Sequence, residues 1–137
     1  MILVDTNVLL DLVLEDDVWA DWSQHQLEAA SVDERLAINP VIYSELSMAF
    51  TRIEDLDHML ADGQFAYEST PWEALFLAGK VFLDYRRRQG TKRGVLPDFY
   101  IGAHAAVMEW PLLTRDPTRY RTWFPTVRLI APEGPRR

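Results

Sequence analysis

The chain has 137 residues, of which 48% are hydrophobic and 26% charged, a composition typical of one globular domain and not of a disordered segment. The absence of cysteine excludes disulfides, a thiolate nucleophile and a thiolate zinc site, and because no signal-peptide pattern or bilayer-length apolar stretch is visible we expect a soluble, cytoplasmic protein. The formal net charge of −7 argues against a general nucleic-acid coat, which is usually basic.

The first half of the chain alternates short apolar runs with helical patterns. Residues 2–4 and 36–38 are apolar runs bounded by turn residues and predict two buried strands. Helices are predicted over residues 6–14, 16–30, 40–50 and 54–62. The helix over 16–30 has an expected apolar stripe that includes Val18 and Trp22, and Gly63 is the expected C-cap of the helix over 54–62.

The second half repeats this alternation. Further strands are predicted over residues 65–67, 112–114 and 127–130. Thr70-Pro71-Trp72-Glu73 combines N-cap, proline-first and capping-box features, and predicts a helix that runs to about Gln89 and stops at Gly90. After a loop at 91–97, Asp98 begins a helix that reaches about Glu109. Strands alternating with helices predict an α/β fold, a single domain over residues 1–131 with a parallel sheet between helices, followed by a loose tail at 132–137.

Four carboxylates stand at strand ends, at a helix start or on an inward helix face. Asp5 ends the first strand, Asp116 follows the fourth, Asp98 begins a helix, and Glu45 shares a predicted apolar face with residues that include Ile42 and Met48. The three Asp residues have a plain structural explanation as well, since Asp is a common N-cap and Asp116 precedes a proline in a turn. Ligands bind at the carboxyl ends of strands in open α/β sheets, so we expect these side chains to share a pocket.

Four close carboxylates cannot all be ionised without compensation, because like charges raise one another's pKa. A divalent cation supplies that compensation, and hard oxygen donors without a thiolate or a histidine pair favour Mg²⁺ or Mn²⁺. Such an ion activates water and stabilises charge on a phosphodiester. We therefore predict metal-assisted phosphodiester hydrolysis. Asp11, Asp84 and Glu109 are expected to be surface or capping acids, and His104 to be packed or solvated and not catalytic.

Four segments together resemble the PIN-domain ribonucleases, and in particular VapC-type toxins of bacterial or archaeal toxin–antitoxin pairs. They are Ile2–Asp11, Ile38–Leu46, Leu96–Ala105 and Pro111–Asp116, with Tyr120 shortly afterwards. Any one segment is weak, but all four occur in family order over almost the whole chain. The resemblance implies a five-stranded parallel sheet and an acidic pocket that holds Mg²⁺ or Mn²⁺.

The resemblance also implies roles for individual residues. Asp5 and Asp98 would be the main metal ligands, Asp116 would complete the site directly or through water, and Glu45 would hold or activate the attacking water. Further residues expected to line the substrate pocket are Thr6, Asn7, Thr114 and Arg115. Family members are homodimeric endoribonucleases, often cut tRNA or rRNA, and are silenced by a small antitoxin.

One departure from the family pattern concerns the end of the acidic motif. Many relatives carry another acid shortly after the last Asp, whereas this chain has Thr118 and Arg119, which leaves the number of metals open. The basic cluster over 86–93 could contact RNA phosphate or simply suit a helix end.

Two other classes of protein remain as alternatives. A dehalogenase-like phosphatase would need Asp where Asn7 stands, and a receiver domain would need an acidic pair before the first strand. A PIN-fold protein that only binds RNA or protein would keep the fold without the reaction.

Overall fold

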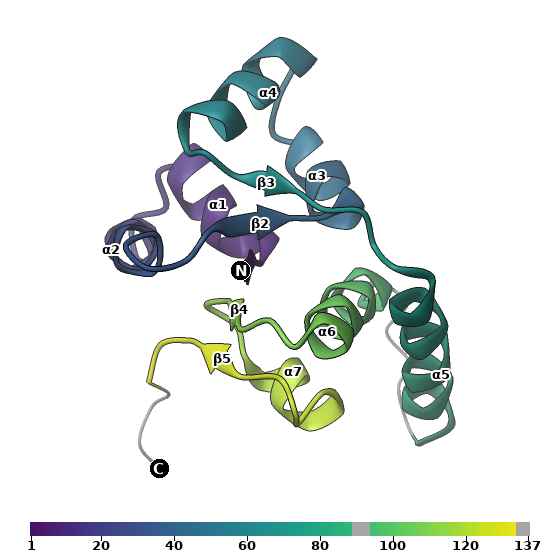
Figure 1. Cartoon of the computed structure of the whole chain (residues 1–137). Helices are drawn as coiled ribbons and strands as arrows, with labels where there is room; N and C mark the ends of the chain where they lie inside the picture. The colour runs from purple at the N-terminus through teal and green to yellow at the C-terminus, as the bar shows by residue number, and fades with distance from the viewer. Residues whose placement is uncertain (89–93, 134–137) are drawn as a thin grey trace.

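The structure is a computed structural model that describes residues 1–88 and 94–133. Its centre is a five-stranded sheet in the order β3-β2-β1-β4-β5, in which every neighbouring pair is parallel. The strands are β1 (Ile2–Val4), β2 (Leu36–Ile38), β3 (Ala66–Tyr67), β4 (Leu112–Leu113) and β5 (Leu129–Ile130). Figure 1 shows the helices arranged around this sheet, which confirms the predicted α/β class.

Seven helices occur within the described residues. They are α1 (Thr6–Val13), α2 (Ala20–Ala30), α3 (Pro40–Ser47), α4 (Ile53–Asp62), α5 (Trp72–Arg88), α6 (Leu96–Met108) and α7 (Thr118–Trp123). The most extensive helix packing joins α5 to α6, and α1 packs on both α2 and α3.

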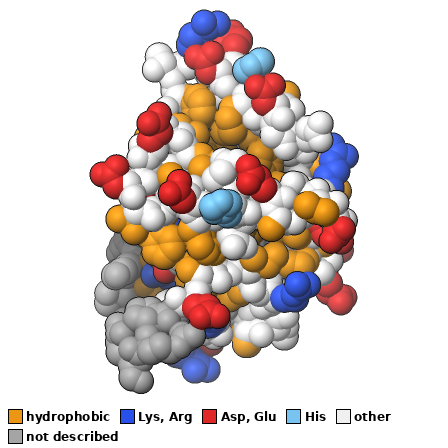
Figure 2. Space-filling view, turned by 90° about the vertical axis from the view of Figure 1, so that its left-hand side faces the viewer, with side chains coloured by type: hydrophobic (Ala, Val, Ile, Leu, Met, Phe, Trp, Pro, Cys, Tyr) orange, Lys and Arg blue, Asp and Glu red, His pale blue; other side chains and the backbone are white. Residues whose placement is uncertain are grey.

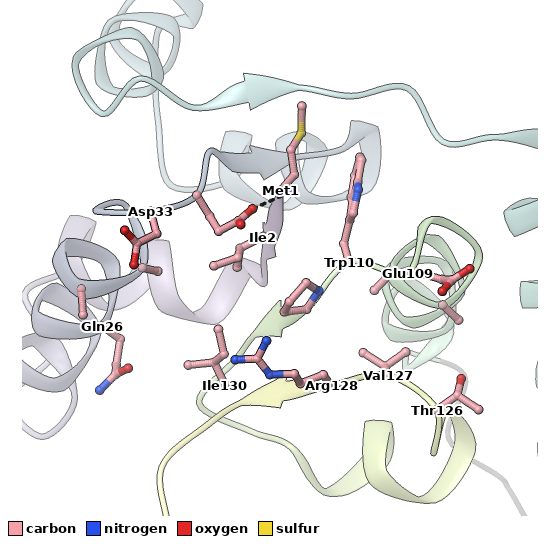
Figure 3. A pocket seen from close by; sticks show the side chains of 16 residues that line it. Met1, Ile2, Gln26, Asp33, Glu109, Trp110, Thr126, Val127, Arg128 and Ile130 are labelled. Carbon is pink, nitrogen blue, oxygen red and sulfur yellow. Dashed lines mark hydrogen bonds and ion pairs between the residues drawn. The ribbon is translucent and has the colours of Figure 1, made fainter.

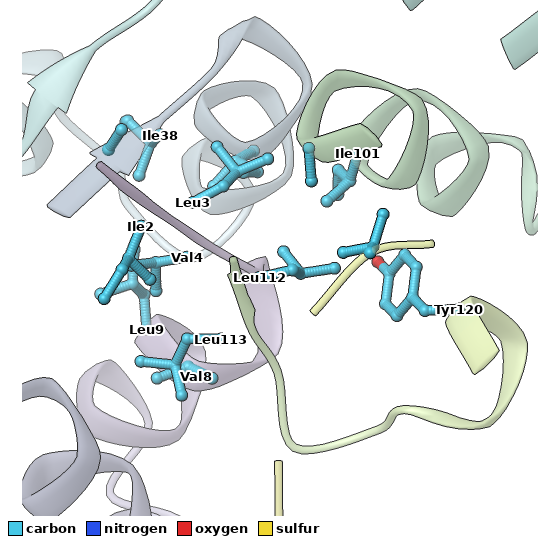
Figure 4. Packing of buried hydrophobic residues seen from close by; sticks show 14 of the residues in the cluster. Ile2, Leu3, Val4, Val8, Leu9, Ile38, Ile101, Leu112, Leu113 and Tyr120 are labelled. Carbon is cyan, nitrogen blue, oxygen red and sulfur yellow. The ribbon is translucent and has the colours of Figure 1, made fainter. Parts of the chain in front are cut away.

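The hydrophobic core surrounds β1, whose three residues are almost completely buried. A strand in the middle of a covered parallel sheet is apolar on both faces, which explains the uninterrupted sequence Ile2-Leu3-Val4. Figure 4 shows Leu3 on the side of Ile101 from α6, while Val4 lies on the side of Val8 and Leu9 from α1. Because successive strand residues point to opposite faces, this single strand anchors a helix on each side.

The second helix begins later than predicted. We expected it from residue 16, but α2 starts at Ala20. The carboxylate of Asp16 accepts hydrogen bonds from the backbone N–H groups of Val18 at 2.9 Å and Trp19 at 2.8 Å. This local turn competes with helix formation, and it leaves Val18 76% exposed, so the predicted inward position of Val18 is wrong.

The α7 helix was not predicted. It has six residues and no side-chain cap, and it follows Pro117 directly. A helix of this length shows too little periodicity to be distinguished from a turn by sequence. Its position depends on burial of Tyr120 and of Phe124 at its end, whose side chains are 1% and 4% exposed.

The starts of the two long helices also differ from the prediction. The Thr70 hydroxyl is buried and has no hydrogen-bond partner within the described residues, so its predicted N-cap role at α5 is wrong. Instead the Pro71 carbonyl accepts from the amides of Ala74 and Leu75. The α6 helix starts at Leu96, which places Asp98 in its first turn and not at its N-cap, the cap being Val95.

Several predicted ends lie near undescribed segments. The expected helix stop at Gln89 and Gly90 falls outside the described residues, as do the first three residues of the loop at 91–97 and the end of the tail at 132–137. Gly63 is the C-cap of α4 as expected, although the positive φ belongs to the next residue, Gln64.

Candidate functional site

Asp5 lies at the carboxyl end of the central strand and its two carboxylate oxygens have different partners. Oδ1 accepts the backbone N–H of Thr6 at 2.8 Å and caps α1. Oδ2 accepts the hydroxyls of Thr114 at 2.8 Å and Tyr120 at 3.0 Å. The capping role and a place in a polar site are therefore compatible, because one oxygen serves each.

Burial sets the electrostatics of Asp5. Asp5 is only 4% exposed, and desolvation raises the pKa of its carboxyl to about 7. The negative charge of Asp98 raises the pKa further, whereas the hydrogen bonds from Thr114, Tyr120 and Thr6 lower it without offsetting burial. Asp5 is thus a carboxyl that gains or loses its proton near neutral pH.

Glu45 reaches the same region from α3. The Thr6 hydroxyl donates a hydrogen bond of 2.6 Å to its Oε1. Partial burial raises the pKa of Glu45, and the charge of Asp98 adds to that effect. The predicted inward helix face is only partly correct, because Ile42 is fully buried but Met48 is 81% exposed.

Asp98 occupies the first turn of α6 and is paired with a residue of α7. The Arg119 Nη1 donates to its Oδ2 at 2.6 Å. Partial burial raises the pKa of Asp98, the guanidinium of Arg119 opposes that rise, and the charge of Asp116 adds to it. Asp116 itself is exposed, and its backbone N–H donates to the Thr114 hydroxyl at 3.1 Å. Asp98 therefore lies close enough to Asp5, Glu45 and Asp116 for electrostatic interaction with each of them.

These residues fit a hard divalent cation by their chemistry. Their donors are carboxylate and hydroxyl oxygens, which Mg²⁺ and Mn²⁺ prefer, and a cation would relieve the repulsion between Asp5 and Asp98. Within residues 1–88 and 94–133, however, no three acidic or histidine side chains are already gathered at metal-binding distance. At Asp98, the guanidinium of Arg119 is paired with a carboxylate oxygen.

Asn7 and Arg115 were both predicted to line the pocket. The structure places the Asn7 side chain beside Asp5, whereas the Arg115 side chain turns to another acid. Asn7 Nδ2 lies 3.3 Å from both Asp5 Oδ2 and Thr114 Oγ1, and its Oδ1 accepts the backbone N–H of Arg115 at 3.2 Å. The Arg115 side chain instead turns to Asp11, with Nε at 2.9 and 2.8 Å from the two carboxylate oxygens. Its guanidinium thus lies on Asp11 and not on one of the four acids.

Asp11 is not the surface acid that we expected. It is 2% exposed and also accepts a hydrogen bond of 2.8 Å from the hydroxyl of Ser23 in α2. The arginine and serine together satisfy a buried charge that joins α1, α2 and the segment after β4. Asp11 faces inward at a position that its polar character alone would assign to the surface.

Two residues of the site were missed by sequence reasoning, Tyr120 and Arg119. In the sequence, Tyr120 stands out only as an aromatic residue shortly after the last motif. Arg119 stands out only because many relatives carry an acid in this region. Neither spacing nor residue type indicates that they reach Asp5 and Asp98, since α7 itself was not predicted.

His104 is packed and not solvated. It is buried, its Nδ1 lies 3.1 Å from Asn39 Nδ2, and burial lowers its pKa to about 4.

The basic cluster of the sequence is only partly described. Arg86 and Arg88, in the last turn of α5, lie over the rings of Phe82 and Trp123 at 6.0 and 5.9 Å. Arg88 also pairs with Asp84, so that acid has the surface role we expected. Lys92 and Arg93 lie outside the described residues.

A groove of about 1020 Å³ lies at the opposite edge of the sheet from the acids. Figure 3 shows its lining residues, among them Met1, Trp110 and Arg128, which stand at or just before the starts of β1, β4 and β5. None of the eight predicted site residues lines it. Ligands of parallel sheets bind at the carboxyl ends of strands, so we place the candidate site at Asp5 and not in this groove.

The fold and the site define an α/β protein with a partly buried carboxylate group at the carboxyl edge of a parallel sheet. The model of the PIN domain family matches residues 2–122. The chain belongs to the PIN domain family, which sets aside the phosphatase and receiver-domain alternatives. A search of curated proteins finds no significant match to the sequence.

Solved structures share this fold at low sequence identity. A chain in the VapBC2 complex of Rickettsia felis, bound to a promoter DNA fragment, is 18% identical, with a TM-score of 0.75 over 97% of this chain and 100% of that one. A toxin–antitoxin complex from Klebsiella pneumoniae gives 23% identity and a TM-score of 0.67 over 93% and 95% of the two chains. A chain in VapBC-1 of nontypeable Haemophilus influenzae is 16% identical, with a TM-score of 0.67 over 96% of this chain and 98% of that one.

Among the described residues, no helix is long and apolar enough to cross a membrane.

Proposed function

We propose that this protein is a metal-dependent endoribonuclease and the toxin of a VapBC-type toxin–antitoxin pair. The observation that carries the proposal is the convergence of Asp5, Glu45, Asp98 and Asp116 from four different segments on one edge of the sheet. Each acid of this group that is wholly or partly buried has a raised pKa. Perturbed carboxyls at the carboxyl edge of an α/β sheet are typical of functional sites.

Asp5 and Asp98 are the proposed ligands of Mg²⁺ or Mn²⁺, with Asp116 completing the site directly or through water. A bound divalent cation would supply positive charge to the scissile phosphate and to the carboxylates around it. Asp5 must lose its proton to act as a ligand, and the hydrogen bonds from Thr114 and Tyr120 favour its ionised form.

Glu45 is the proposed general base. The Thr6 hydroxyl holds Oε1 at 2.6 Å, which orients the carboxylate and leaves Oε2 to accept a proton from an attacking water. Burial raises the pKa of Glu45, and a carboxylate with a raised pKa accepts a proton more readily than an exposed glutamate does.

The proposed partners are RNA, such as tRNA or rRNA, a VapB-type antitoxin and a second copy of the chain, all in the cytoplasm. Figure 2 shows acidic side chains scattered among hydrophobic patches on the face where α2 lies. Leu14, Val18 and Val32, which flank α2, are 65%, 76% and 77% exposed. Apolar surface rimmed by acids suits a basic, amphipathic antitoxin segment, and the similar solved structures are described as toxin–antitoxin complexes.

A second candidate is a PIN-fold protein that binds RNA or protein without cutting. The ion pair between Arg119 and Asp98 favours it, because that pair neutralises an acid which the reaction needs. All four acids are nevertheless present, so the nuclease remains the proposal.

The test is induced expression of wild type, Asp98→Asn and Asp84→Asn in a bacterial host, followed by sequencing of new RNA 5′ ends. Asp84 is a matched control, because it is an exposed acid paired with Arg88 at a helix end. We expect growth arrest and discrete new ends with wild type and Asp84→Asn, and neither with Asp98→Asn. In a purified assay on RNA from the native organism, wild type and Asp84→Asn should cleave with Mn²⁺ and not with EDTA. Asp98→Asn should cleave in neither condition.

Cleavage by purified Asp98→Asn at saturating metal would contradict the assignment of the site. Folded wild-type protein that cuts no RNA in the host or in the purified assay would move the conclusion to the binding role.

A further inference from the structure

The Arg119–Asp98 pair places a cation of the chain itself inside the acidic site. Arg119 lies in α7 and Asp98 in α6, and the Nη1 to Oδ2 distance is 2.6 Å. The two side chains are 26% and 31% exposed, so the contact is partly shielded from water and salt. A charge-assisted hydrogen bond of this length is stronger than a neutral one.

Arg119 is the single Lys or Arg that pairs with any of the four site acids within residues 1–88 and 94–133. Arg115 is nearer in sequence to Asp116 but pairs with Asp11. Arg121, on the same helix as Arg119, is exposed. The position is therefore specific to Arg119 and does not reflect a generally basic surface.

The backbone that carries Arg119 is fixed to the site. The next residue, Tyr120, is buried and donates to Asp5, the other proposed metal ligand. At the end of α7, Phe124 is in close contact with Gly102 of α6, and Figure 1 shows α7 between α6 and β5. Release of Asp98 by Arg119 thus requires rotation of one long side chain and no movement of the helix.

We propose that Arg119 sets the affinity of the acidic site for its divalent cation by competing with that cation for Asp98. This inference rests on the proposed function, since it assumes that Asp98 is a metal ligand. The guanidinium of Arg119 occupies Oδ2 of Asp98, and its positive charge repels a divalent ion at short range, including an ion that binds through Oδ1. Metal binding must therefore overcome this repulsion or move Arg119 away from Asp98.

The test is titration of metal-free protein with Mn²⁺, followed by calorimetry, for wild type, Arg119→Ala, Arg119→Gln and Arg121→Ala. Arg121→Ala removes the same charge from the same helix without touching Asp98. We expect Arg119→Ala and Arg119→Gln to bind Mn²⁺ about three- to tenfold more tightly than wild type, and Arg121→Ala to bind like wild type. Arg119→Gln keeps a long polar side chain and serves if the alanine variant does not fold.

The thermal stability of the same proteins provides a second measurement. Metal-free Arg119→Gln should melt below wild type, because Asp98 loses its partner, and saturating Mn²⁺ should raise its melting temperature by more than it raises that of wild type.

Equal or weaker Mn²⁺ binding by both Arg119 variants, with wild type binding normally, would overturn the inference and leave the proposed nuclease intact. Failure of wild type and of both variants to bind Mn²⁺ would overturn the metal site itself, and the inference with it. Binding by the variants alone would support the competition strongly.

Discussion

The Tyr120 hydroxyl donates a hydrogen bond of 3.0 Å to Oδ2 of Asp5, although 115 positions separate the two residues. Both side chains are nearly inaccessible to water. This contact connects the last helix of the domain to the end of its central strand. It therefore links the stability of the fold to the charge of the candidate site.

Tyr120→Phe should destabilise the protein by about 1–2 kcal/mol, because it removes a hydrogen bond to a buried carboxylate. The pKa of Asp5 should rise above its wild-type value, since the Tyr120 hydrogen bond lowers it. Denaturant unfolding measures the first effect. Tyr43→Phe is the control, because the Tyr43 hydroxyl donates a hydrogen bond of 2.6 Å to Asp57 at an exposed site, where water can replace the lost partner and the loss of stability should be smaller. Equal losses in the two variants would contradict the importance of burial.

The stability of the metal-free protein should depend on pH through Asp5. Folding raises the pKa of Asp5 from 3.8 to about 7, so between these values the folded state holds a proton that the unfolded state has lost. The free energy of unfolding therefore falls as pH rises from about 4 to about 7, by an amount on the order of a few kcal/mol from this group. Saturating Mg²⁺ should reduce the decline, because the cation favours the carboxylate.

Asp5→Asn separates this effect from that of His104, which acts in the opposite direction. Burial lowers the His104 pKa from 6.5 to about 4, so its contribution to stability increases as pH rises across that interval. The difference between wild type and Asp5→Asn at each pH isolates the carboxyl. Parallel pH profiles for the two proteins would show that Asp5 does not titrate in this range.

Arg115→Met should destabilise the protein by about 2 kcal/mol, because it leaves the Asp11 carboxylate buried without its cation while Ser23 still donates to it. Adding Asp11→Leu should recover most of the loss by removing the unpaired charge. Arg88→Met is the matched control, since it breaks an exposed helical pair with Asp84 and should cost under about 0.5 kcal/mol. Thermal melts of the four proteins make the comparison. If Arg115→Met is as mild as Arg88→Met, the buried pair contributes no more than an exposed one.

Gly102→Ala should destabilise the domain by about 1–3 kcal/mol through overpacking. A Cβ at Gly102 would lie 2.4 to 2.9 Å from ring atoms of Phe124, and α7 would have to shift. Phe124→Leu should lessen the cost in the double variant.

Gly79→Ala is the control for Gly102→Ala. Gly79 lies inside α5 with nothing within 4 Å of an added Cβ, so alanine there should stabilise the protein by roughly 1 kcal/mol through helix propensity. Chemical denaturation should therefore give shifts of opposite sign, and shifts of the same sign would refute the packing explanation.

The local sequence was sufficient to predict the strands of the sheet. Ile2-Leu3-Val4 and Leu36-Ala37-Ile38 are apolar without interruption because both faces of these strands are covered, and that pattern is legible without a structure. The same holds for Pro40 in the first turn of α3, where its missing N–H has no cost. The start of α2 could not be placed in this way, because the Asp16 turn competes with a pattern that also suits a helix.

The sequence by itself determined the α/β class and the parallel sheet, and it predicted Asp5, Glu45, Asp98 and Asp116 as candidate-site residues, since ligands of parallel sheets bind at the carboxyl ends of the strands. Tertiary structure alone decided that Tyr120 reaches Asp5, that Arg119 holds Asp98 and that Asp11 is buried against Arg115. These contacts join residues 21 to 115 positions apart. The reason is physical: whether a polar side chain is a ligand, a counter-charge or a surface group depends on what packs against it, and that partner is brought by the fold and not by neighbouring residues.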